Sequence, residues 1–255
     1  MKNIKSLGQH WLKNRVILDE IASLAANSSA CKSSETSAKL CVEIGPGLGT
    51  LTSSLLKCFE EVIAIEYDAR LATNLPKSFP GKNLKVINED ILKFDFSRIN
   101  NPYVVVGNIP YYITSPIIEK LLKLDNSPKK IVLLIQKEVA ERILDEKETG
   151  LSLFVKNHAF ASAGPIVKKE EFTPPPKVDS QVIILEPHAP KVEEKVFDLI
   201  KTGFTMPRKK LVHNLSSLKS KDEILRIMTE LNIDVNSRPG DIKLENWQKL
   251  SAALK

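Results

Sequence analysis

Short apolar runs rich in β-branched residues alternate with helix-like segments along the first half of the chain. Runs of this length and composition are typical of buried strands. The five runs are Leu40–Ile44, Val62–Glu66, Leu84–Ile87, Tyr103–Val106 and Ile131–Ile135. Because strands that alternate with helices pair in parallel, the pattern predicts an α/β fold with a mostly parallel sheet covered on both faces.

Two segments of this region have clear helical spacing. Ser115–Leu124 places Ile117, Ile118 and Leu121 on one face, and Pro116 suits a first helical turn. Lys137–Glu146 is the second predicted helix. After Gly150 the pattern changes, and we expect Asn157–Ala163 and Val178–Leu185 to pair as strands at an antiparallel edge of the sheet.

A cluster of helix-breaking residues, Pro187 to Pro190, marks the expected domain boundary. We therefore expect a larger α/β domain over residues 1–187 and a small all-α domain over residues 188–255. The second domain contains four predicted helices, which are Val192–Thr202, a segment from Arg208, Lys221–Leu231 and Leu244–Leu254.

Composition excludes several classes of protein. The chain has 255 residues, of which 42% are hydrophobic and 27% charged, as in ordinary globular proteins. No apolar run approaches the roughly 18 residues that cross a membrane, and the N-terminus lacks the apolar stretch of a signal peptide. The three cysteines, Cys31, Cys41 and Cys58, have neither metal nor redox spacing. We expect a cytoplasmic protein without a metal ion.

Positive charge is concentrated at the two ends of the chain. The net charge is +6, and residues 188–255 contribute +4 of it, from 13 Lys and Arg against nine Asp and Glu. The first fifteen residues hold Lys2, Lys5, Lys13 and Arg15 and no acidic residue. This distribution favours a polyanionic partner that contacts both ends.

A glycine turn follows the first predicted strand. In Glu43–Thr50 the glycines Gly45, Gly47 and Gly49 lie before a predicted helix, where backbone N–H groups and the missing side chains let a ligand approach closely. The spacing fits the dinucleotide pattern G-x-G-x-x-G poorly. Glu43 would repel a pyrophosphate but suits the cationic part of S-adenosyl-L-methionine. A plain structural turn is the alternative.

Acidic residues end the next two strands. Glu66 is placed to accept both hydroxyls of a ribose, and Asp90 to accept the amino group of an adenine. Ligands of open α/β sheets bind beyond the carboxyl ends of the strands. The glycine turn, Glu66 and Asp90 therefore predict one nucleoside pocket.

The following strand runs into Asn108-Ile-Pro-Tyr111 at the same edge of the sheet. The exocyclic amine of a nucleobase is a poor nucleophile, since its lone pair is delocalised into the ring. The side-chain carbonyl of Asn108 and a backbone carbonyl near Pro110 can accept its two N–H groups and aim the lone pair at a methyl group. Tyr111 offers a ring on which an extruded base can stack. The alternative interpretation is purely structural: Asn108 caps a turn, and Tyr111 packs in the core.

Five motifs in order along the chain carry a resemblance to a known family. They are Gly8-Gln-His-Trp-Leu12, Glu43–Thr52, Asn108-Ile-Pro-Tyr111, Phe172-Thr-Pro-Pro-Pro-Lys-Val-Asp-Ser180 and Arg208-Lys-Lys-Leu-x-x-Asn214. Together they resemble the KsgA/RsmA family of small-subunit ribosomal RNA adenine dimethyltransferases. The resemblance covers nearly the whole chain.

The resemblance implies a class I methyltransferase fold and two methyl transfers to the N6 of each of two adjacent adenosines in the 3′-terminal hairpin of 16S rRNA. It implies that S-adenosyl-L-methionine is held by the N-terminal motif together with the strand ends, and that Phe172 faces Tyr111 across the flipped adenine. The residues expected to bind the cofactor are His10, Leu12, Gly45, Gly47, Glu66, Asp90 and Asn108.

Candidate RNA contacts lie at both basic ends. Arg208, Lys209 and Lys210 form one run, and Lys13 and Arg15 precede the first strand of the sheet. Such runs contact phosphates in many RNA-binding proteins, although most charge runs are solvated faces. The expected partner is the immature 30S subunit, and the expected oligomeric state is a monomer.

Two alternatives stay open. The Erm-type enzymes that methylate 23S rRNA share the Asn-Ile-Pro-Tyr turn, but the Pro-Pro-Pro-Lys-Val-Asp-Ser form and the Arg208 segment favour the small-subunit family. A non-catalytic ribosome-assembly or transcription factor could keep the same fold, but the intact Asn108, Pro110, Tyr111 and glycine turn argue against it.

Overall fold

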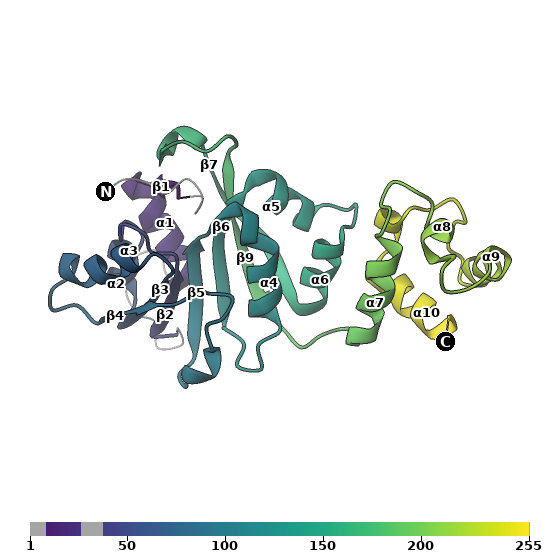
Figure 1. Cartoon of the computed structure of the whole chain (residues 1–255), viewed down its shortest axis with the longest axis horizontal. Helices are drawn as coiled ribbons and strands as arrows, with labels where there is room; N and C mark the ends of the chain where they lie inside the picture. The colour runs from purple at the N-terminus through teal and green to yellow at the C-terminus, as the bar shows by residue number, and fades with distance from the viewer. Residues whose placement is uncertain (1–8, 27–37, 255) are drawn as a thin grey trace. The chain divides into compact units, whose positions relative to one another are not determined.

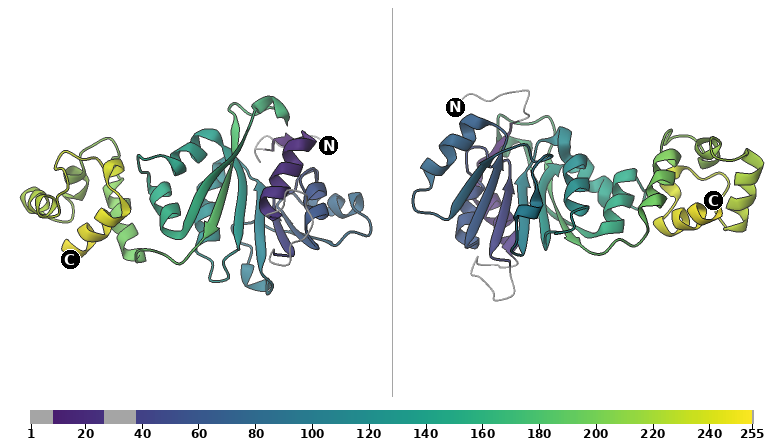
Figure 2. Two further views of the ribbon diagram at one scale, coloured as in Figure 1. Left: turned by 180° about the vertical axis from the view of Figure 1, so that it is seen from behind. Right: turned by 60° about the horizontal axis from the view of Figure 1, so that its bottom comes forward.

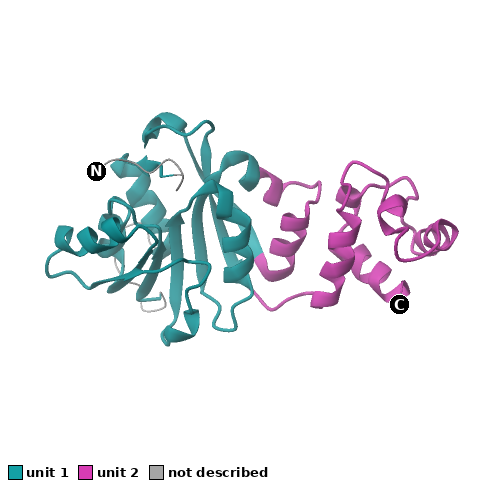
Figure 3. Cartoon of the chain, in the orientation of Figure 1, with its two compact units in different colours: residues 1–140, 160–187 teal, residues 141–159, 188–255 magenta. Residues whose placement is uncertain are grey.

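The computed structural model describes residues 9–26 and 38–254 (Figure 1). The chain divides into two compact units (Figure 3). The first comprises residues 1–140 and 160–187, and the second residues 141–159 and 188–255. The sequence places the start of the small domain at residue 188, whereas the second unit also takes in residues 141–159.

A seven-stranded sheet forms the centre of the first unit, in the order β4-β3-β2-β5-β6-β9-β7. The five strands from β4 to β6 are parallel, and β9 is antiparallel to β6. This is the mostly parallel sheet with an antiparallel part that the sequence predicts. The strands are β2 (Leu40–Ile44), β3 (Glu61–Glu66), β4 (Leu84–Asn88), β5 (Tyr103–Asn108), β6 (Lys130–Gln136), β7 (Ala159–Val167) and β9 (Ser180–Pro187).

Helices cover both faces of this sheet, as Figures 1 and 2 show. Helices α1 (Arg15–Ala26) and α2 (Thr52–Cys58) pack on one face, where their apolar residues join Val104 and Val106 of β5 in one core cluster. Helices α3 (Ala69–Asn74) and α4 (Thr114–Leu122) complete the layers. Because successive side chains of a strand point to opposite faces, Val105 is buried on the other side. A strand buried on both faces, such as β5, has no solvent-facing side, which explains its continuous apolar run in the sequence.

The order of the strands reverses at β2, since β3 lies on one side of it and β5 on the other. Ile44 of β2 pairs with Gly107 of β5, so the glycine turn after β2 begins beside Asn108. In open α/β sheets such a reversal opens a crevice at the carboxyl ends of the strands. The fold therefore brings two of the predicted motifs together.

A two-stranded sheet holds the N-terminal motif against the Phe172 motif. Strand β1 (Trp11–Leu12) pairs antiparallel with β8 (Phe172–Thr173), with Leu12 opposite Phe172. Both side chains are buried in the core cluster. Asn14 then caps α1, since its side-chain oxygen accepts a hydrogen bond from the Val16 N–H at 3.0 Å.

The second unit is helical. It contains α6 (Gly150–His158), α7 (Glu194–Gly203), α8 (Leu211–Leu215), α9 (Lys221–Glu230) and α10 (Leu244–Ala253), and α5 (Lys137–Leu144) ends in it. Trp247 of α10 is fully buried, and a Cβ atom at Gly203 of α7 would lie 2.2 Å from its ring. Glycine is therefore required where α7 meets α10.

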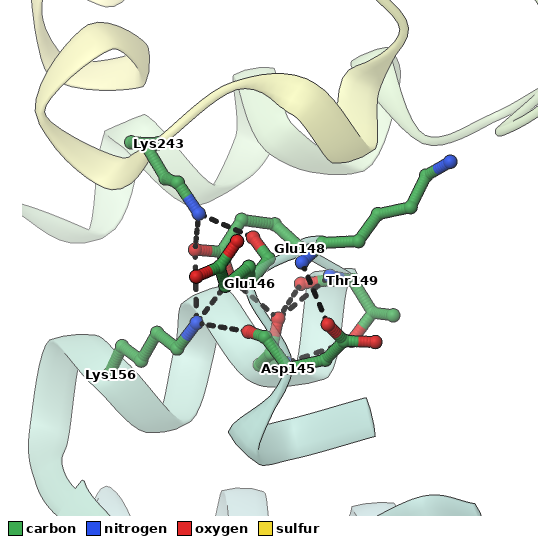
Figure 4. Close-up of polar contacts among 8 residues, drawn as sticks. Asp145, Glu146, Glu148, Thr149, Lys156 and Lys243 are labelled. Atoms are coloured by element: carbon green, nitrogen blue, oxygen red, sulfur yellow. Dashed lines mark hydrogen bonds and ion pairs between the residues drawn. The ribbon is translucent and has the colours of Figure 1, made fainter. Parts of the chain in front are cut away.

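A buried carboxylate ties residues 141–159 to the C-terminal helices of this unit (Figure 4). Glu148 is 5% exposed and accepts hydrogen bonds from Lys156 at 2.9 Å and from the Ser152 hydroxyl at 2.8 Å. Lys243, which precedes α10, lies 3.4 Å from the same carboxylate, and the Glu148 N–H donates to the Gly240 carbonyl at 2.8 Å. These contacts explain why residues 141–159 cluster with residues 188–255.

One predicted strand is partly wrong. Residues 157 and 158, expected to begin a strand, end helix α6 instead. A capping box at Thr149 and Ser152 starts this helix. The other predicted strands and helices occur with shifts of a few residues at their ends. Within residues 9–26 and 38–254 no helix has the length and apolar character that a membrane crossing requires.

Candidate active site

A cavity of about 340 Å³ lies at the carboxyl ends of β2, β3 and β5. The described residues that line it include nine of the predicted site residues, which are His10, Leu12, Gly45, Gly47, Glu66, Asp90, Asn108, Pro110 and Tyr111. Segments from five parts of the chain thus meet around one space, four of them at the strand ends and one from the N-terminal motif. Phe172, Lys13 and Arg15 do not line it.

The glycine turn has a left-handed backbone conformation, and the ring of Trp11 lies close to it. Gly47 has a φ of 59°, and a Cβ atom there would lie 3.1 Å from the indole nitrogen of Trp11. Any other residue would be strained at this φ, and its Cβ atom would crowd the Trp11 ring. The glycine spacing therefore reflects packing of the N-terminal motif on the turn, in addition to the room it leaves for a ligand.

Glu66 fixes this turn from the end of β3. Its carboxylate accepts hydrogen bonds from the Gly47 N–H at 3.0 Å and from the Asp68 N–H at 2.8 Å. Burial raises the pKa of Glu66 above its usual range, although these two N–H groups act in the opposite direction. Each carboxylate oxygen has a second lone pair, which is available to a hydroxyl group in the cavity.

Asp90 follows β4 and is partly exposed at the cavity wall. One of its carboxylate oxygens accepts a hydrogen bond from the Leu92 N–H at 2.9 Å, which holds the side chain in a turn. Its other oxygen has no hydrogen bond to residues 9–26 or 38–254. The position suits an acceptor for the amino group of a purine.

Glu43 is the most deeply buried acid of the site, with 1% of its surface exposed. Burial raises its pKa to about 8, and the nearby Glu66 contributes in the same direction. The hydroxyl of Thr52 donates to the carboxylate at 2.6 Å. A cationic ligand in the cavity would stabilise the ionised form of this carboxyl group.

Asn108 is oriented by the N-terminal motif. Its side-chain N–H donates to the His10 carbonyl at 2.9 Å, so its side-chain oxygen is the atom left to accept a hydrogen bond. That oxygen has no hydrogen-bond partner among the described residues. The amide is therefore arranged as the sequence predicts for an acceptor of an amino group.

Pro110 and Tyr111 continue the same turn. Pro110 has a φ of −60°, and its carbonyl accepts one hydrogen bond, from the Ile113 N–H at 3.2 Å, which leaves its second lone pair available. The Tyr111 hydroxyl lies 2.6 Å from the Ser180 hydroxyl. Burial raises the pKa of Tyr111, so the hydroxyl is a neutral hydrogen-bonding group. The sequence shows Ser180 only as the last residue of a motif and does not reveal this contact.

The ring beside Tyr111 is that of His10 and not that of Phe172. The His10 and Tyr111 rings are nearly parallel, at 18°, with centroids 6.2 Å apart, and His10 Nδ1 lies 2.8 Å from the Pro174 carbonyl. Phe172 is 2% exposed and packs in the core cluster behind β8. The predicted place of Phe172 opposite Tyr111 is therefore not found, because pairing with Leu12 directs Phe172 into the core.

The residues around the cavity suit S-adenosyl-L-methionine. The wall contains four acidic side chains, Glu43, Glu66, Glu89 and Asp90, which would repel a pyrophosphate. Three of them, Glu43, Glu66 and Asp90, suit the cationic, hydroxyl and amino groups of that molecule. The described residues contain no group of three or more His, Cys, Asp or Glu that could hold a metal ion.

The predicted RNA contacts lie in both units. In the second unit, Arg208 and Lys209 are exposed, whereas the Lys210 ammonium donates to the Asn236 side chain at 2.6 Å. The buried Asn214 side chain bonds both the N–H and the carbonyl of Met206, at 3.1 and 3.2 Å, and so fixes the start of this basic turn.

At the other basic end, Lys13 is exposed, but Arg15 is engaged within the first unit. The Arg15 guanidinium donates to the Ser53 hydroxyl at 2.9 Å and lies 3.7 Å from Asp19. Lys2 and Lys5 lie outside the described residues.

Comparison with known proteins adds separate evidence on the family of the chain. A protein-family model described as ribosomal RNA adenine dimethylase matches residues 1–255. The chain is 40% identical to ribosomal RNA small subunit methyltransferase A of Crocosphaera subtropica, over 97% of this chain and 96% of the relative. It is 36% identical to the protein of the same name from Nostoc, over 98% and 97%.

Two solved structures are similar over most of the chain. A dimethyladenosine transferase from Plasmodium falciparum superposes with a TM-score of 0.75 at 29% identity, covering 94% of this chain and 96% of that one. The 23S rRNA methyltransferase ErmE superposes with a TM-score of 0.73 at 24% identity, covering 96% and 99%, and shows the shared fold. The chain therefore belongs to the ribosomal RNA adenine dimethylase family.

Proposed function

We propose that this protein transfers methyl groups from S-adenosyl-L-methionine to the N6 atoms of two adjacent adenosines in the 3′-terminal hairpin of 16S rRNA. As a family member it is a ribosomal RNA adenine dimethyltransferase, and S-adenosyl-L-methionine is its methyl donor. The observation that carries the proposal is the free side-chain oxygen of Asn108 at the wall of a cavity that also contains Glu43, Glu66 and Asp90.

The cofactor would be held along the strand ends. We assign the ribose hydroxyls to Glu66, the adenine amino group to Asp90 and the cationic end of the molecule to the region of Glu43, with His10, Leu12, Gly45 and Gly47 completing the wall. When bound, the cofactor supplies an electrophilic methyl group. The backbone contacts of Glu66 keep its carboxylate in place before the ligand arrives, which lowers the entropy cost of binding.

Asn108 and Pro110 would activate the target amine. The Asn108 side-chain oxygen and the second lone pair of the Pro110 carbonyl each accept one N–H of the adenine amino group, which moves the nitrogen toward tetrahedral geometry. The His10 carbonyl keeps Asn108 in the orientation that presents its oxygen. No strong base is needed, since the methylated amine is acidic enough to lose its proton to water.

Tyr111 would bind the flipped base by stacking. Its ring is held from two sides, by the Ser180 hydroxyl and by the parallel ring of His10, so little freedom is lost when a base arrives. The stacking role predicted for Phe172 requires a movement of β8 that exposes its ring, and we give it no part in the reaction.

The partner of the enzyme is ribosomal RNA. That the form recognised is the immature 30S subunit, in the cytoplasm and by a monomer, is our proposal. We assign phosphate contacts to Arg208, Lys209 and Lys13, because these cations are exposed, and give lesser roles to Lys210 and Arg15, whose charged groups already have protein partners.

The alternatives have less support. The relatives with 36% and 40% identity are both called ribosomal RNA small subunit methyltransferase A. The ErmE structure is only 24% identical, so its similarity supports the fold and not the choice of substrate. A non-catalytic assembly factor would not need the free side-chain oxygen of Asn108 beside a cavity that suits S-adenosyl-L-methionine.

A subunit assay tests the proposal. Unmodified small and large ribosomal subunits are incubated separately with the protein and S-adenosyl-L-methionine, and the RNA is digested and analysed by mass spectrometry. We expect two dimethylated adenosines in the 3′-terminal fragment of 16S rRNA and none in 23S rRNA. Modification of 23S rRNA alone, or of neither RNA, would refute the proposal.

A further inference from the structure

We propose that Tyr112 is a second stacking platform, which holds the nucleobase next to the adenine being methylated. The inference rests on the proposed function and extends it from one base to two. It concerns a residue that the sequence motifs leave without a role, since the motif ends at Tyr111.

Tyr112 is an exposed aromatic side chain at the rim of the reaction cavity. It lines the cavity, yet 63% of its surface is exposed. It makes no hydrogen bond and no ring contact with the described residues, 9–26 and 38–254. A tyrosine that is neither buried nor bonded contributes little to folding, so its presence at the rim favours a ligand contact.

The adjacent Tyr111 is different in each of these respects. Its hydroxyl is bonded to Ser180, and its ring lies parallel to that of His10. The two tyrosines belong to one short 3₁₀ helix, Tyr111–Ile113, that begins directly after Pro110. One ring is thus fixed in the site, while the next along the chain is presented to solvent from the same rigid turn.

An extruded base leaves its neighbours without a stacking partner. Unstacking and unpairing a base costs free energy in base-flipping enzymes. An aromatic ring just outside the cavity can replace the lost stack, and such base–aromatic contacts do not depend on sequence. Tyr112 satisfies this requirement because it directly follows the residue whose ring is assigned to the target base.

Two other exposed aromatic residues, Tyr67 and Phe160, do not meet this requirement. Tyr67 also lines the cavity, but it directly follows Glu66 and so belongs with the cofactor. Phe160, on β7, is 64% exposed and does not line the cavity. Phe160→Ala therefore provides a control with equal exposure and no predicted contact with the base.

The test combines protein and RNA changes. Small subunits are reconstituted with 16S rRNA that has both adenosines or an abasic nucleotide in place of one of them. Methyl transfer to the remaining adenosine is measured with the wild type, Tyr112→Ala, Tyr112→Phe and Phe160→Ala, and cofactor affinity is measured by calorimetry.

With intact RNA we expect Tyr112→Ala to lower kcat/KM about 5- to 150-fold, the range for removal of one base–aromatic stack. Tyr112→Phe and Phe160→Ala should keep nearly full activity, and cofactor affinity should not change. With abasic RNA, Tyr112→Ala should have almost no further effect, because the stacking partner is already missing.

Equal losses from Tyr112→Ala on intact and abasic RNA would overturn the proposal, as would full activity of Tyr112→Ala on intact RNA. Absence of methyl transfer by the wild type to intact subunits would instead refute the proposed function. The two failures are therefore distinguishable.

Discussion

The hydroxyl oxygens of Tyr111 and Ser180 lie 2.6 Å apart, although 69 residues separate them in the chain. This contact joins the Asn-Ile-Pro-Tyr turn to the end of the Pro-Pro-Pro-Lys-Val-Asp-Ser motif. It gives Ser180, which is fully buried, a role in positioning a ring of the active site. Two motifs that are distant in the sequence thus build one structure.

Removal of this contact should slow catalysis without affecting the cofactor. We expect Ser180→Ala to lower kcat about 5- to 10-fold, since a hydrogen bond of about 1 kcal/mol no longer fixes the Tyr111 ring. Tyr111→Phe should have a similar effect. The Ser180→Ala, Tyr111→Phe double variant should be no slower than either single variant, and losses that multiply would contradict the contact.

Glu43 should make stability depend on pH. Its pKa is raised from 4.5 to about 8 in the folded protein, so between these values the native state holds a proton that the unfolded state has released. The free energy of unfolding should therefore fall as pH rises through this range, by up to about 1.4 kcal/mol per pH unit. In Glu43→Gln this part of the slope should vanish.

Urea denaturation at several pH values between 4.5 and about 8, without cofactor, measures both slopes. Identical slopes for the wild type and Glu43→Gln would mean that Glu43 is ionised in the folded protein.

Arg208 and Lys209 should account for most of the electrostatic RNA affinity of the basic turn. Replacing both with Ala should weaken binding and reduce the slope of log affinity against log salt by about 0.7–0.9 for each phosphate that is no longer neutralised. Lys210→Ala should have a smaller effect, because its ammonium group is bonded to Asn236. The control variant is Lys201→Ala, which removes an exposed lysine of α7. An unchanged salt slope in the variant with both Arg208 and Lys209 replaced would show that these residues do not contact RNA phosphates.

Glu148 should be essential for the stability of the second unit. Glu148→Ala leaves the Lys156 and Lys243 ammonium groups without their shared carboxylate and the Ser152 hydroxyl without its acceptor. Because both ammonium groups are partly exposed to water, we expect a loss of about 1–3 kcal/mol. Glu245→Ala, an exposed acid of α10, should change stability little. Hydrogen exchange can locate the loss of stability, which should appear as faster exchange in residues 141–159 and 239–253. Unchanged exchange in α6 would show that the contacts of Glu148 are not needed for its stability.

Much of the first unit could be predicted from the sequence, because a strand buried on both faces is mostly apolar, as in Val104–Val106 of β5 and Ile131–Ile135 of β6. The polar residues after these runs then mark the strand ends, and parallel strands bring Glu66, Asp90 and Asn108 to one edge. The same reasoning does not predict α6. This helix begins at a capping box at Thr149, and the neighbouring Glu148 is bonded to Lys243, almost a hundred positions away in the chain.

The fine structure of the site could not be predicted for a related reason. Trp11 against Gly47, His10 beside Tyr111 and Ser180 on the Tyr111 hydroxyl are contacts between distant segments, and no local pattern records them. The same lack explains why the burial of Phe172 could not be predicted. An aromatic residue before three prolines is compatible with stacking on a base, but its pairing with Leu12 decides that it is buried.

The central claim is that the side-chain oxygen of Asn108 holds the target amine. Single-turnover methyl transfer to unmodified small subunits, compared between the wild type and Asn108→Ala at saturating cofactor, tests it most directly. Loss of one such acceptor should slow the chemical step by about 10²- to 10³-fold while RNA affinity stays within a few-fold of the wild type. Methyl transfer by Asn108→Ala at the wild-type rate would contradict the account.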